Sequence, residues 1–108
     1  MALLLLAACH TEPPAPATDA AICTNAPAVT WDDWGQGFFL TWCASCHSAS
    51  APDRRGAPLG VDFDRATDVQ AWSDRIRARV LEDGTMPLGG GLSEDDALLL
   101  DVLLTCGG

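Results

Sequence analysis

The sequence predicts an all-α protein with one domain. Three segments begin with a Ser or Thr that is followed three residues later by a side chain able to complete a capping box. No segment shows the alternating apolar and polar pattern of a half-buried strand. A chain of 108 residues with a hydrophobic fraction of 48% fits one small globular domain, and no apolar run approaches the ~18 residues that a membrane-spanning helix needs.

The N-terminal residues favour export. Residues 1–8 are apolar and end in Leu6-Ala7-Ala8-Cys9, which resembles the lipobox of bacterial lipoproteins, where cleavage precedes the cysteine and its thiol is lipidated. The segment is short and has no basic region, which a truncated start would explain. The alternatives are a short secretory segment or an unmodified Cys9. We expect a periplasmic protein or one that is anchored to a membrane through Cys9.

A linker is expected to join this segment to the domain. Residues 9–22 contain the Pro- and Ala-rich run 11–21, which predicts an extended chain, and residues 23–108 are assigned to the domain. His10 lies in this linker and is not expected to be a ligand.

The first helix is expected at about 31–44, after Thr30 and Asp33, and the second after Thr67 and Gln70. In the first, Gly35, Phe39 and Cys43 share one line at i, i+4 and i+8, so this line should face one partner. The second is amphipathic and should lie on a core, because apolar side chains recur at spacings of three and four: Val69, Trp72, Ile76 and Val80.

The third helix is expected at about 94–106, after Ser93 and Asp96. Its first turn is acidic, which the helix dipole favours, and the rest is apolar almost all round, so it should be largely buried. Segments 56–63 and 84–92 are Gly-rich and predict loops.

The net charge is strongly negative, with 6 basic and 15 acidic residues giving 6 − 15 = −9. This balance disfavours nucleic acid and anionic lipid as partners. It permits docking to a basic protein surface, although the charge can equally serve solubility alone.

The segment Cys43-Ala44-Ser45-Cys46-His47 is the c-type haem attachment motif. On a helical turn the two thiols lie on one side, where both can reach the vinyl groups of a porphyrin, and His47 follows as the proximal iron ligand. A thioredoxin-like pair would need a βαβ context, and a zinc site would need a second pair of ligands. The sequence offers neither.

From about Trp31 to Cys106 the chain resembles a class I monohaem cytochrome c. The resemblance implies a cytochrome c fold with three main helices packed around one covalent haem c. It also implies that Gly35 and Phe39 let the first and last helices cross closely. A family proline after the haem His, whose carbonyl accepts a hydrogen bond from the imidazole, corresponds to Pro58, which can alternatively be a plain loop residue.

The sixth ligand decides whether the iron is closed to substrates. Met86 lies in Gly84-Thr85-Met86-Pro87, which resembles the family's axial Met-Pro pair, and a thioether favours ferrous iron. Plain core packing is the alternative for Met86.

The remaining cysteines and cations suggest supporting roles. With Cys43 and Cys46 on haem and Cys9 on lipid, Cys23 and Cys106 remain to form a disulfide, unless both are free thiols. Four side chains are candidates for bonding haem propionates, with solvated surface or core roles as alternatives: Arg54, Arg55, Trp72 and Arg75.

These inferences predict an electron transfer protein, not an enzyme, that cycles between ferrous and ferric iron as a monomer or as part of a complex. Two alternatives stay open. The chain can be a haem subunit of a larger oxidoreductase, or a peroxidase-like or ligand-sensing protein in which Met86 dissociates.

Overall fold

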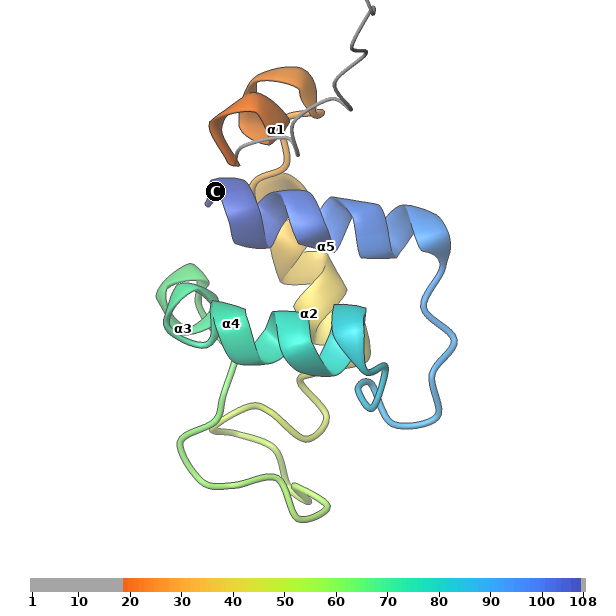
Figure 1. Ribbon diagram of the computed structural model, residues 1–108. Helices are drawn as coiled ribbons and strands as arrows, with labels where there is room; N and C mark the ends of the chain where they lie inside the picture. The colour runs from red at the N-terminus through yellow and green to blue at the C-terminus, as the bar shows by residue number, and fades with distance from the viewer. Residues whose placement is uncertain (1–18, 108) are drawn as a thin grey trace, which may run out of the picture.

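The computed structural model describes residues 19–107, and every regular element in that range is a helix (Figure 1). The predicted all-α class is therefore confirmed for this part of the chain. The apolar start, Cys9, His10 and most of the predicted linker lie outside the described residues. Between residues 19 and 107, no helix combines the length and apolarity needed to cross a bilayer.

The first predicted helix is formed by η1 (Trp31–Gly35), a π-helical turn, and α2 (Gln36–Trp42), which continues it. The Thr30 hydroxyl accepts from the Asp33 N–H at 3.2 Å, and the Asp33 carboxylate accepts from the Thr30 N–H at 2.9 Å. This second bond is the main reason that the pKa of Asp33 lies below its usual value. The predicted capping box is confirmed, and the helix ends two residues before the expected Ala44.

The second predicted helix is divided into two parts. α3 (Ala66–Ala71) is followed by α4 (Ser73–Ile76) and its continuation η2 (Arg77–Glu82). The break falls at Trp72, whose φ of −103° and ψ of 10° are not helical. Figure 1 shows the resulting change of direction between α3 and α4.

The predicted start of this helix at Thr67 and Gln70 is wrong. The N-cap is Arg65, whose backbone N–H donates to the Asp68 carboxylate at 3.1 Å. A carboxylate in the first turn that reaches back to the N-cap N–H performs the same function as the expected box. The predicted apolar face is confirmed, because Val69 and Ile76 are buried.

The third predicted helix is α5 (Glu94–Cys106), and the Ser93 hydroxyl accepts from the Asp96 N–H at 3.1 Å. Leu100, Val102 and Leu103 are buried. Leu98, however, is 58% exposed, so the expectation that α5 is largely buried does not hold on that side.

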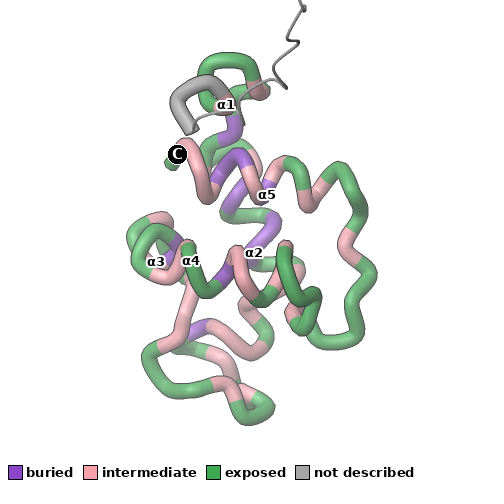
Figure 2. The backbone as a smooth tube through the Cα atoms, in the orientation of Figure 1, coloured by how far each residue is buried: buried purple, intermediate pink, exposed green. Residues whose placement is uncertain are grey.

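The core lies where the helix formed by η1 and α2 passes α5, and Figure 2 shows buried residues concentrated there. Gly35 makes the approach close: a Cβ on it would lie 3.0 Å from Leu103 Cδ2 and 3.2 Å from Trp31 Cε3. Phe39, one turn later, is only 1% exposed. The expected close contact between these two helices is thus present.

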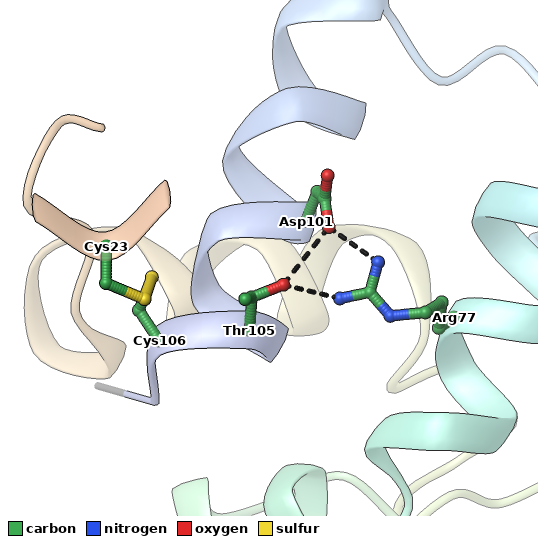
Figure 3. The surroundings of a disulfide bond; sticks show 5 residues. All are labelled: Cys23, Arg77, Asp101, Thr105 and Cys106. Atoms are coloured by element: carbon green, nitrogen blue, oxygen red, sulfur yellow. Dashed lines mark hydrogen bonds and ion pairs between the residues drawn. A yellow bond between two sulfur atoms is a disulfide. The ribbon is translucent and has the colours of Figure 1, made fainter. Parts of the chain in front are cut away.

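A short helix, α1 (Asp19–Asn25), precedes this core and was not predicted. Its first residues fall within the run expected to be an extended linker. Cys23 of α1 is disulfide-bonded to Cys106 at the end of α5, with Cα atoms 5.4 Å apart, as predicted from the two remaining cysteines (Figure 3). The bond ties the start of the domain to its last helix.

A polar contact joins η2 to α5 (Figure 3). Arg77 forms an ion pair with Asp101 through Nη1 and donates to the Thr105 hydroxyl through Nη2 at 2.7 Å. Since both charged side chains are partly exposed, the pair adds little free energy beyond orientation. It fixes the helix that leads into the Met86 loop against α5.

Candidate functional site

The haem attachment motif forms a helical turn directly after α2. Two consecutive N–H groups, of Cys43 and Ala44, donate to the Phe39 carbonyl at 3.0 and 2.9 Å. The N–H groups of Cys46 and His47 then donate to the Cys43 carbonyl at 3.2 and 2.8 Å. The turn geometry predicted for the motif is therefore present, and both cysteines are free and half-buried.

Burial raises the pKa of the Cys43 thiol to about 12, and the neighbouring Cys46 adds to the shift. Cys43 is therefore protonated at neutral pH. Redox-active CxxC pairs depend on a thiol with a lowered pKa, because the thiolate is the nucleophile. The shift of Cys43 is opposite to the one that a thioredoxin-like function requires.

His47 is held by a backbone carbonyl. Its Nδ1 lies 2.7 Å from the Val61 carbonyl oxygen. Because a carbonyl can only accept, Nδ1 carries the proton, and in the neutral imidazole this leaves Nε2 with the lone pair that can ligate a metal. The same arrangement is typical of metal-bound histidines, where the bond fixes the ring and raises its basicity.

The accepting residue differs from the one expected. Pro58 does not contribute the carbonyl to His47; its oxygen accepts instead from Arg54 Nη2 at 2.7 Å. Val61, three residues further along the same loop, takes that role. Sequence reasoning missed Val61 because the group that acts is a backbone carbonyl, which any residue carries.

Phe63 is the second contact that the sequence did not reveal. Its N–H donates to the His47 carbonyl at 2.9 Å, and its ring centroid lies 4.9 Å from that of His47. The ring also packs on Phe39 of the core at 5.7 Å. Phe63 thus connects the imidazole to the helix crossing.

Arg54 lies among loop carbonyls. Its guanidinium donates to the carbonyl oxygens of four loop residues: Ser48, Ala57, Pro58 and Val61. It also forms an ion pair with the Asp62 carboxylate at 2.6 Å. Arg54 thus has a structural role in the loop, and its role toward a haem propionate stays a prediction. Among the other candidates, Arg55 and Arg75 are exposed, and Trp72 packs against the core.

Met86 lies half-buried in the loop between η2 and α5. Its N–H donates to the Arg79 carbonyl at 3.0 Å. The Asp83 carboxylate accepts from both the N–H and the hydroxyl of Thr85, at 3.0 and 2.7 Å, and the hydroxyl bond is the main cause of the lowered pKa of Asp83. These bonds order the approach to Met86.

The same loop passes the end of α2. A Cβ on Gly91 would lie 3.8 Å from the Trp42 ring, and Trp42 directly precedes Cys43. The structure therefore brings the loop that carries Met86 and the attachment motif to the same end of one helix.

The end of α2 carries two thiols on one turn and an imidazole, and the loop that passes it carries a soft thioether; these donor types would fit haem. Leu59 and Leu88, which lie in the loops that carry Val61 and Met86, are 88% and 63% exposed, so an apolar partner would find apolar side chains there. Among residues 19–107, no three His, Cys, Asp or Glu side chains gather to form a metal site of their own.

Comparisons of the chain with protein-family models, with curated proteins and with solved structures give no match.

Proposed function

We propose that this protein is a one-electron carrier of the class I cytochrome c type. Haem c is attached through Cys43 and Cys46, and His47 and Met86 are the axial ligands of the iron. The observation that carries the proposal is the contact of 2.7 Å between His47 Nδ1 and the Val61 carbonyl, directly after the CxxCH turn. It prepares Nε2 as a ligand where the motif requires one.

Attachment needs both thiols reduced, and Cys43 and Cys46 are free. Each thiol would add across a vinyl group, with sulfur bonding to one vinyl carbon and hydrogen to the other. This addition consumes no oxidant. Haem then supplies the electron-accepting iron, while His47, Met86 and the loops hold it and limit the access of water.

Met86 makes a carrier the preferred function. A six-coordinate iron has no open position for a substrate, and a thioether raises the potential by favouring the ferrous state. Electron transfer then needs only an exposed haem edge near the thiols. The net charge of −9 favours redox partners with a basic docking surface.

The ligand-sensing alternative has one observation in its favour. Gly89, Gly90 and Gly91 all have positive φ, of 84°, 66° and 91°, in the loop that carries Met86. Glycines impose few restrictions on the backbone, so this loop can rearrange easily. Release of Met86 would open the iron to small ligands.

Mass spectrometry of the mature protein and absorption spectra test the proposal. Covalent haem raises the mass, and the double variant Cys43→Ser/Cys46→Ser loses that mass. The weak far-red band of the ferric protein reports Met ligation and should vanish in Met86→Ala. Leu88→Ala, a truncation in the same loop, is the matched control and should keep the band. A wild-type mass without haem would contradict the function, and an unchanged band in Met86→Ala would contradict the ligand.

Export and anchoring are part of the proposal and rest on Cys9. We expect the mature protein to begin at a lipidated Cys9 and to fractionate with membranes. Cys9→Ser should release it into the soluble fraction. A stable stoichiometric complex after detergent extraction would instead favour the haem subunit of a larger oxidoreductase.

A further inference from the structure

We propose that Arg54 is a positioning residue for His47, acting by holding the Val61 carbonyl to which the imidazole donates. This inference rests on the proposed function for its importance, because it concerns the ring that ligates the iron. The contacts that carry it belong to the chain itself and are independent of haem.

The guanidinium of Arg54 makes four hydrogen bonds and one ion pair. Four carbonyl oxygens accept from its nitrogens, and Asp62 Oδ1 lies 2.6 Å from Nη1 as an ion pair, without a hydrogen bond of its own. The carbonyl oxygens are those of Ser48, Ala57, Pro58 and Val61. The planar guanidinium of Arg54, with these partners, holds the loop that leads from the CxxCH motif to Phe63.

Arg54 and His47 share one acceptor. The Val61 carbonyl oxygen lies 2.7 Å from His47 Nδ1 and 3.4 Å from Arg54 Nη2. The Arg54 bonds to Ala57 and Pro58, at 3.3 and 2.7 Å, fix the backbone that leads into Val61. Without Arg54 this segment keeps the bonds from the Val61 N–H to Pro58 and from the Phe63 N–H to His47, but the Val61 carbonyl loses its restraint from the guanidinium.

The burial of the pair makes the arrangement specific. The side chains of Arg54 and Asp62 are 15% and 19% exposed, so the ion pair is shielded from water. Asp62 balances the charge of Arg54, so the cation that lies among the carbonyls has an anionic partner. A residue whose main role was surface charge would not need these partners.

The experiment follows the Nδ1 proton of His47 by NMR in the full-length protein labelled with ¹⁵N-histidine. In Arg54→Gln, we expect this proton to exchange with solvent about two- to tenfold faster, the range given by one hydrogen bond. Arg54→Lys offers at most three donors and should give an intermediate rate. Arg55→Gln removes the same charge from the adjacent exposed residue and should leave the rate unchanged.

General destabilisation is separated from positioning by the amide of Leu100, which is fully buried in α5. If the His47 proton and the Leu100 amide accelerate together, or if the His47 proton keeps its wild-type rate, the proposal is overturned. The outcome is distinct from that of the proposed function. A protein without haem would refute the carrier, whereas the His47 exchange rates would still decide the role of Arg54.

Discussion

Replacing Gly35 with alanine tests how closely the helix formed by η1 and α2 packs on α5. The backbone of Gly35 is right-handed helical, with φ −59° and ψ −45°, so alanine fits the local conformation. The new Cβ would lie 3.0 Å from Leu103 Cδ2 and 3.2 Å from Trp31 Cε3, closer than ordinary contact. Leu103 is 5% exposed, so it has little room to move away.

Two opposing effects determine how much Gly35→Ala changes the free energy of unfolding. Alanine is favoured over glycine inside a helix by about 1 kcal/mol. Overpacking a filled core costs typically 1–3 kcal/mol. The sum predicts that Gly35→Ala lowers the free energy of unfolding by about 0–2 kcal/mol. Gly37 is a matched control: it lies in the same helix, a Cβ on it meets nothing within 4 Å, and Gly37→Ala should stabilise by about 0.5–1 kcal/mol.

Chemical denaturation of the two variants gives both free energies. We expect Gly35→Ala to be the less stable by about 1–3 kcal/mol. In a Leu103→Ala background the penalty should shrink, because the contacting methyl group is gone, and the double-mutant cycle measures this coupling. Equal stabilisation by the two alanines would refute the close crossing, and an absence of coupling would refute the assignment of the clash to Leu103.

Three further predictions concern stability. The double variant Cys23→Ser/Cys106→Ser removes a bond between residues 83 apart and should lower the free energy of unfolding by at most about 4–5 kcal/mol; a reducing agent should then affect the wild type but not the variant in thermal melts. Phe39→Ala should cost about 3–5 kcal/mol in urea unfolding, since Phe39 is 1% exposed; the exposed Leu40→Ala serves as control. The N–H of Ala49, followed by the Ser48 hydroxyl, lowers the pKa of Asp64 in the folded protein, so its contribution is complete above pH ~4 and is lost as pH falls through the folded value. Asp64→Asn should therefore flatten the fall of stability in acid, and an unchanged profile would contradict the Asp64 assignment.

The helices could be predicted because their signals are local. Thr30 and Ser93 cap their helices as expected, since a short polar side chain before an apolar run has one favourable use there. The second helix shows the limit of this reasoning. Thr67 and Asp68 both offer capping groups, and the choice between them depends on where Val69 reaches the core.

The exposure of Leu98 has a similar cause. Periodicity shows that a segment can be buried but not how much neighbouring structure is available to cover it. α5 packs against α1, η1 and η2, and the side of Leu98 is left open. Helix α1 was missed for a related reason: a helix of seven residues is marginal by itself, and a disulfide to Cys106 holds this one in place.

In the candidate site, too, some residues could be predicted from the sequence and others could not. Cys43, Cys46 and His47 could be found because their chemistry resides in side chains at a fixed spacing. The acceptor for His47 could not, because Val61 and Pro58 offer identical carbonyls and only the loop conformation selects between them. Arg54 carries a visible charge, but nothing in the sequence indicates that its partners are backbone oxygens.

The two candidate ligands are therefore supported differently. His47 is held by the Val61 carbonyl, the Phe63 ring and, through Val61, the buried pair of Arg54 and Asp62. In the part of the chain that the structure describes, the hydrogen bonds of the Met86 segment stay within its own neighbourhood, from Arg79 to Gly90. A local set of bonds resists rearrangement less than one that spans the fold. If haem is bound as proposed, Met86 is the ligand that we expect to exchange more readily, and its release would open the iron to small ligands.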